Sequence, residues 1–162
     1  MKYRVLTTEE LGALEDDLKA FLIVNGIDGS EWEKINQTNP DKAIQLVELF
    51  SDLVLDKTYE KIKFLEFRSK NILVVFHVLT KEIISITLTL DNQDLGDFST
   101  IESIHKTFVE HASNIKYQVN TKIGFDNRNL EVHKLLESGC VLSAEEFWVS
   151  LTKAIDLKQD KL

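Results

Sequence analysis

Hydrophobic residues recur at three- and four-residue steps through the first sixty positions, which is the period of an amphipathic helix. The clearest run covers residues 11–22, where leucine and phenylalanine are separated by acidic and basic side chains. Thr7 and Glu10 have the spacing of a capping box, in which each side chain satisfies a backbone N–H at a helix start. Asn25-Gly26 supplies the matching end. These features predict one helix close to the N-terminus.

Two more helices are predicted before residue 60. Ser30 and Glu33 repeat the capping-box spacing, which favours a short second helix. Asn39 as N-cap and Pro40 at the first helical position then open a third helix. Apolar residues cover more than half of the circumference of this third helix, so we expect it to pack against neighbours on two sides.

The pattern changes near residue 60 to one typical of strands. Residues 62–67 fit either the end of the helix or the start of a strand, and residues 72–79 and 82–90 predict a hairpin. If Leu79 faces Glu82, one face of this hairpin is almost wholly apolar. That face comprises Leu73, Val75, His77, Leu79, Ile84, Ile86 and Leu88. The opposite face of the second strand is rich in serine and threonine, so we expect this strand at an edge of the sheet.

The rest of the chain predicts a helix, a strand and two final helices, at residues 100–113, 115–125, 130–138 and 144–155. The strand alternates apolar and polar residues strictly, which indicates one solvated face. A capping box at Ser143 and Glu146 opens the last helix.

These elements predict an α+β fold with N-terminal helices, an antiparallel meander of three or four strands, and C-terminal helices packed on one sheet face. A chain of this length suits a single globular domain over residues 1–162. Within it we expect a helical layer at residues 1–60, the sheet with one inserted helix at residues 61–125, and the C-terminal helices at residues 126–162. The last residues, 156–162, are expected to fray.

The net charge of −8, with a pI near 5.0, narrows the choice of partners. An acidic chain repels phosphate groups, so we expect no nucleic acid and no membrane as a partner. The apolar runs are far shorter than the ~20 residues that a membrane helix needs. The lone cysteine, Cys140, cannot form an internal disulfide, and no export signal opens the chain. The sequence therefore predicts a cytoplasmic protein.

His77 is the first candidate for chemistry, because the hairpin register places it on the apolar face and predicts that it is buried. A buried imidazole can act as a general base or as a metal ligand. Together with a carboxylate such as Glu66, it would suit a metal-assisted hydrolase. The imidazole can equally hydrogen-bond a neighbouring group as an ordinary core residue. We favour this structural interpretation, because no second ligand can be identified in the sequence.

Glu102 and His105 stand three residues apart on a predicted helix, a spacing at which a carboxylate and an imidazole bind one metal ion. A di-iron site needs a second such pair, which the sequence lacks, so solvated helix surface is the favoured interpretation. Glycine-rich phosphate loops and nucleophile motifs are absent as well. We therefore expect no cofactor.

Basic side chains outnumber acidic ones only in residues 61–90. The basic residues of this segment are Lys61, Lys63, Arg68, Lys70 and Lys81. They predict an interaction surface for an acidic protein or for the acidic first helix of a second copy. The alternative, which we favour, is that these lysines protect a solvated edge of the sheet from unwanted pairing.

Three segments carry a family resemblance: Met1-Lys2-Tyr3-Arg4 with Leu6-Thr7 and Glu9-Glu10-Leu11, then Val24-Asn25-Gly26-Ile27-Asp28, and Phe64-Leu65-Glu66-Phe67-Arg68-Ser69. The chain resembles an uncharacterised family of short cytoplasmic proteins, mainly from Bacteroidetes. That family has no established activity, so the resemblance implies no functional residues. We expect a binding or protein-interaction module without catalytic activity, possible partners being another protein or a second copy. The alternative is a metal-assisted hydrolase built on His77 with a carboxylate such as Glu66, or on Glu102 and His105.

Overall fold

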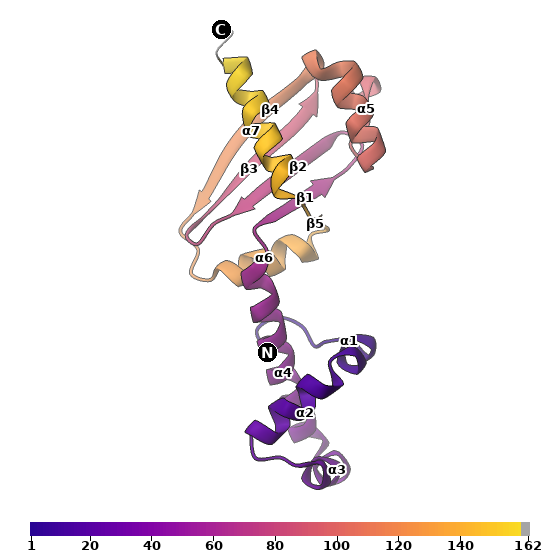
Figure 1. Ribbon diagram of the computed structural model, residues 1–162, viewed down its shortest axis with the longest axis vertical. Coiled ribbons are helices and arrows are strands. Elements are labelled where there is room, and N and C mark those ends of the chain that lie inside the picture. The colour runs from indigo at the N-terminus through magenta and orange to yellow at the C-terminus, as the bar shows by residue number, and fades with distance from the viewer. Residues whose placement is uncertain (160–162) are drawn as a thin grey trace. The chain divides into compact units, whose positions relative to one another are not determined.

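The chain divides into two compact units, Met1–Glu60 and Lys61–Leu162. A computed structural model describes residues 1–159, without the side chains of residues 93 and 157–159 (Figure 1). The boundary between the units coincides with the expected start of the sheet region at residue 61. The expectation that both units form one globular domain stays a prediction.

The first unit is helical, as predicted. Its helices are α1 (Thr8–Ala13), α2 (Glu15–Val24), α3 (Gly29–Thr38) and α4 (Pro40–Lys61). The capping box of Thr7 and Glu10 is confirmed. The helix that it opens is interrupted, however, because Leu14 leaves the helical conformation with φ −110° and ψ 23°. Asp28, rather than Ser30, caps α3, since its carboxylate accepts the backbone N–H of Glu31 at 2.9 Å.

Four residues from three helices and a connecting loop form a buried core in this unit. They are Leu22, Ile27, Ile35 and Ala43. The start of α4 is set as the sequence predicts, because the side chain of Asn39 accepts the backbone N–H of Lys42 at 3.2 Å. Among residues 1–159, no helix is long and apolar enough to cross a membrane.

The second unit is built on an antiparallel sheet of five strands, in the order β4-β3-β2-β1-β5. The strands are β1 (Phe64–Arg68), β2 (Ile72–Val78), β3 (Glu82–Leu90), β4 (Ile115–Ile123) and β5 (Val141–Leu142). The α+β fold is confirmed, but the expected count of three or four strands was too low. The missed strand, β5, has only two residues, which is too few to show any alternation.

The predicted register of the hairpin is confirmed, with His77 opposite Ile84. The prediction that β3 lies at an edge was wrong, because β3 pairs with β2 on one side and with β4 on the other. The hydroxyl residues of β3 indicate that one of its faces is less apolar. They do not indicate which strands pair with its edges, since backbone groups alone make those bonds.

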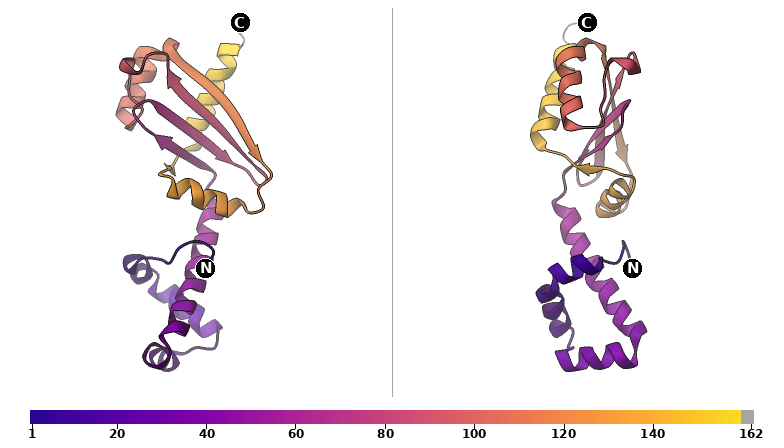
Figure 2. Two further views of the ribbon diagram at one scale, coloured as in Figure 1. Left: turned by 180° about the vertical axis from the view of Figure 1, so that it is seen from behind. Right: turned by 90° about the vertical axis from the view of Figure 1, so that its right-hand side faces the viewer.

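Two helices, α5 (Ile101–His111) and α7 (Glu145–Gln159), cover one face of the sheet (Figures 1 and 2). Their apolar residues bury Leu73, Val75 and Ile86 in the centre of the face, as the pattern predicts. Short 3-10 turns, η1 (Gln93–Leu95) and η2 (Ala112–Asn114), flank α5. Helix α7 continues past the predicted end at residue 155, as far as Gln159. Residues 160–162, for which fraying is also expected, lie outside the described residues.

Helix α6 (Arg128–Glu137) lies on the other side of the sheet, at one end (Figure 2). Arg128 ties it to the sheet region by donating hydrogen bonds to the backbone carbonyls of Ile62 and Val78. Val132 of α6 is completely buried. Together, α6 and α7 confirm the expected C-terminal helices, but they do not pack on the same face of the sheet, because α6 lies opposite α7.

Strand β4 departs from its pattern. Its alternation predicts one covered face, yet every residue from Gln118 to Ile123 is exposed, whichever face its side chain extends from. This strand lies at the sheet edge, where β3 is its only neighbouring strand among the described elements.

Candidate functional site

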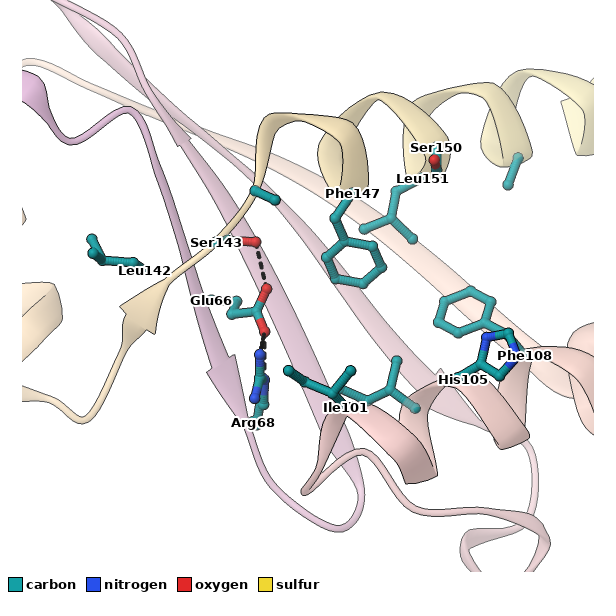
Figure 3. A pocket seen from close by; sticks show the side chains of 13 residues that line it. Glu66, Arg68, Ile101, His105, Phe108, Leu142, Ser143, Phe147, Ser150 and Leu151 are labelled. Carbon is teal, nitrogen blue, oxygen red and sulfur yellow. Dashed lines mark hydrogen bonds and ion pairs between the residues drawn. The ribbon is translucent and has the colours of Figure 1, made fainter.

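A pocket of about 560 Å³ lies on the covered face of the sheet, between α5 and α7 (Figure 3). Residues of β1, β5, α5 and α7 line it, together with the segment that joins β5 to α7. All of them belong to the second unit. The sheet and its two covering helices therefore determine how the pocket residues are arranged.

The walls of the pocket are apolar because each helix repeats hydrophobic residues on one face. Ile101, Ile104 and Phe108 follow three- and four-residue steps along α5. Phe147 and Leu151 do the same along α7. Figure 3 shows Ile101 and Phe108 of α5 and Phe147 and Leu151 of α7 at the space between the two helices.

One end of the pocket is polar and holds a nearly buried carboxylate. Glu66 and Arg68 are two residues apart on β1, so both side chains extend from the same face of the strand. Glu66 is only 3% exposed, whereas one quarter of the Arg68 side chain is exposed. Arg68 donates to Glu66 Oε1 through Nε and pairs with it through Nη2, and the hydroxyl of Ser143 donates to Oε2 (Figure 3). The buried carboxylate is thus fully compensated, as a buried charge must be.

Ser143 acts differently from its prediction. The sequence assigns it to the capping box of α7, but its hydroxyl bonds to Glu66. Helix α7 begins at Glu145, and the backbone carbonyl of the preceding residue, Ala144, accepts hydrogen bonds from the N–H groups of Phe147 and Trp148. The predicted capping box is therefore wrong, and the same serine is a residue of the pocket.

His105 lines the pocket, at the end far from Glu66 in Figure 3, while its predicted metal-binding companion Glu102 does not. Both residues are exposed on α5. Among the described residues, no group of three histidine, cysteine, aspartate or glutamate side chains is placed to hold a metal ion.

His77 was predicted to be buried, but the structure leaves it half-buried. Its ring stacks on Phe64 with a centroid distance of 4.5 Å and contacts Trp148 at 5.3 Å. Burial has the largest effect on His77 and lowers its pKa from the usual 6.5. The carboxylate of Glu145 raises this pKa, and Lys63 lowers it. The prediction of full burial fails because this position lies next to the end of β2, where the two aromatic rings cover only part of the imidazole.

The hypothetical pair of His77 and Glu66 is separated by the strand register. His77 faces Phe64 on the neighbouring strand, and Glu66 faces Val75. Diagonal neighbours of this kind lie roughly 7–8 Å apart, and Phe64 occupies the position next to the imidazole. Glu66 is bound to Arg68 and Ser143 instead, so the structure does not assemble the two groups into one site.

The five basic residues of the sheet region do not form one surface. Lys63 and Lys81 lie at one end of β2, whereas Lys70 lies in the turn at its other end. The seven residues of β2 span roughly 23 Å between those ends. Lys61 is the last residue of α4, and Arg68 is paired with Glu66 in the pocket.

The sequence predicts other roles for Glu66, Arg68 and His105, and it gives no indication that the apolar walls form a site. The two-residue spacing of an acidic and a basic side chain within the apolar segment Phe64–Arg68 was the available signal. Such a pair on an apolar strand face must be desolvated, and buried charges occur in pairs. The contribution of α7 has no comparable signal, because it depends on tertiary packing.

Comparison with known proteins gives a family but no activity. No curated protein and no solved structure matches the chain. A model of a family of unknown function, DUF6495, matches residues 1–156. The match covers nearly the whole chain, in keeping with the uncharacterised family that the sequence resembles. This protein therefore belongs to the DUF6495 family of unknown function.

Proposed function

We propose that this protein is a non-catalytic binding module that holds a small, mostly apolar molecule with a neutral, hydrogen-bond-accepting head. The observation that carries the proposal is the apolar pocket that ends in the compensated group of Glu66, Arg68 and Ser143. A primary amide, an ester or a lactone on an acyl chain has the required chemistry.

The size and lining of the pocket support a small molecule as ligand. Ligand sites in proteins usually enclose about 300–1,000 Å³ and combine apolar walls with a few placed polar groups. The pocket between α5 and α7 has about 560 Å³ and meets both conditions. An elongated chain would lie between Ile101 and Phe147, with its head toward Arg68 (Figure 3).

The charge of the polar end favours a neutral head. Arg68 has five N–H groups, of which Glu66 occupies two, so donors remain for an acceptor on the ligand. The charges of Glu66 and Arg68 already cancel. A carboxylate head would add an uncompensated negative charge next to Glu66, and an ammonium head would meet the guanidinium of Arg68. A carbonyl oxygen avoids both penalties.

Binding fits the site better than catalysis because the polar groups satisfy one another. The hydroxyl of Ser143 donates to a carboxylate that Arg68 neutralises, whereas an activated serine needs a free base beside it. His77, the candidate general base, does not line the pocket. The hydrolase hypothesis therefore has no support from the pocket geometry.

The setting that we propose is the cytoplasm of a bacterium of the Bacteroidetes, as the resemblance implies. Cys140 agrees with a reducing compartment, since it is a free, buried cysteine and burial raises the pKa of its thiol. The acidic net charge supports the expectation that neither nucleic acid nor a membrane is a partner.

Titration calorimetry with octanamide, octanoate and octylammonium tests the proposal, because each probe has eight carbon atoms in an unbranched chain and the three differ in the charge of the head. We expect octanamide to bind most tightly. Ser150→Trp, which fills the pocket from its exposed wall on α7, should abolish binding. Val149→Trp is the matched control, since Val149 is exposed on the same helix but does not line the pocket. Absence of binding by all three probes, or equal binding by both variants, would refute the proposal.

A further inference from the structure

Strand β4 is the second feature of the sheet unit that suggests a partner, and it is independent of the pocket. It lies at the end of the strand order, with β3 as its one neighbour among the described strands. Val119 is 51% exposed and Ile123 is 71% exposed, although both extend from the face that α5 and α7 cover elsewhere. An exposed edge of this length is a ready template for pairing with another strand.

The hydrogen bonds of the sheet define which backbone groups of β4 point outward. Asp91 donates its N–H to the carbonyl of Asn114 at 3.0 Å, and these two residues continue the β3–β4 register. In an antiparallel ladder, alternate residues bond to the same neighbour. Even-numbered residues of β4 therefore bond to β3, and the N–H and C=O groups of Val119, Thr121 and Ile123 point away from the sheet.

We propose that β4 pairs with β4 of a second copy of this chain, antiparallel, around a two-fold axis at Thr121. This register places Thr121 opposite its equivalent and Val119 opposite Ile123 of the second copy. Outward-pointing groups then meet outward-pointing groups at all three pairs, so each pair can exchange two backbone hydrogen bonds. On the helix-covered face, the exposed valine and isoleucine side chains cover each other.

Charge favours this register and a copy of the same chain as the occupant. Lys122 faces Asn120 of the second copy, and its ammonium is already paired with Glu131 at 2.5 Å. A register centred on Val119 would instead place Lys122 opposite Lys116, and like charges directly opposite destabilise a strand pair. Lysines often protect an edge strand, but Lys116 is also paired, with Asp91 at 2.6 Å. The register centred on Thr121 thus places no like charges opposite each other between residues 119 and 123.

Sedimentation of the chain of residues 1–162 over a range of concentrations tests the association. We expect a concentration-dependent dimer, weak because the interface is small, and at least a tenfold rise in its dissociation constant for Val119→Lys. Val109→Lys is the matched control, since Val109 is 70% exposed and belongs to α5, outside the strand that would pair. A strict monomer at every concentration, or equal effects of both variants, would overturn the proposal.

Cysteine cross-linking tests the register of the strand pair. It does not depend on whether Val119→Lys folds. In the proposed pairing, residue 121 faces residue 121 at a Cα distance of roughly 5.5 Å, within disulfide range. Thr121→Cys should therefore form disulfide dimers under mild oxidation, whereas Val119→Cys should not. Dimers from Val119→Cys alone, or from neither variant, would contradict the axis at Thr121. The unmodified chain, whose lone Cys140 is buried, is the background control.

Discussion

The ion pair of Glu66 and Arg68 makes a quantitative prediction about stability, because it places a carboxylate that is 3% exposed against a guanidinium. Arg68→Met removes the guanidinium but leaves the carboxylate in place. Removing one partner of a fully buried pair costs about 3–5 kcal/mol. One quarter of the Arg68 side chain is exposed, so water can partly replace it. We therefore expect a loss of about 2–3 kcal/mol in the free energy of unfolding.

The double variant Glu66→Leu/Arg68→Met separates this penalty from the loss of packing. It removes both charges and keeps apolar volume, so its stability should lie within about 1 kcal/mol of the unmodified protein. The difference between the single and double variants measures the coupling of the two side chains.

Urea unfolding is the appropriate assay, followed by tryptophan fluorescence in a Trp32→Phe background. Trp148 of the second unit is then the remaining tryptophan, so the signal reports on the sheet unit. Two results would contradict this reasoning: an unchanged free energy of unfolding in Arg68→Met, or a double variant that is as unstable as the single one. Either would show that removing Arg68 does not leave Glu66 as an unpaired buried charge.

Three further predictions concern single residues. Burial lowers the pKa of His77, so its protonation favours the unfolded state; NMR titration should place this pKa below 6.5, and stability should fall as the pH drops below that value. Hydrogen bonds from Arg4 and Thr7 lower the pKa of Glu10 to about 2, so Glu10→Gln should cost about 0.5–1 kcal/mol at pH 7 and progressively less from pH 4.5 to 2. Gly96→Ala should cost about 1–3 kcal/mol in thermal or urea unfolding, because its Cβ would lie 2.6 Å from the side chain of Thr107.

Each of these predictions has a contradicting result. A pKa of His77 above 6.5 would show that a negative charge, not burial, dominates its surroundings. A stability loss for Glu10→Gln that persists at pH 2 would exclude the ionised carboxylate as its cause. Gly12→Ala is the control for Gly96→Ala, since no atom beyond its chain neighbours and its own helix backbone lies within 4 Å of its added Cβ. Equal losses in these two variants would argue against steric conflict with Thr107.

The sequence predicts the fold wherever a local pattern determines the structure. The register of His77 with Ile84 follows from a short turn and a two-residue period, and both are visible in one stretch of chain. The start of α4 at Asn39 follows from a cap whose bonds span three residues. Local hydrogen bonding and periodicity decide such features without help from the rest of the molecule.

The sequence could not predict features that depend on distant segments. Ser143 has the spacing of a helix cap, yet a carboxylate 77 positions earlier accepts its hydroxyl. Strand β5 exists because β1 offers it an edge, and its two residues carry no pattern of their own. The pocket likewise arises where two helices with ordinary amphipathic patterns face each other, so its walls look like core residues in the sequence.

The proposed function requires that an acyl amide binds between α5 and α7 with its head toward Arg68. An isotope-filtered nuclear Overhauser experiment with octanamide and labelled protein tests it most directly. We predict contacts from the alkyl chain of octanamide to the methyl groups of Ile101 and Ile104 and to the ring of Phe147, with the amide end nearest Arg68. Contacts confined to other residues, or the opposite orientation of the chain, would contradict this account.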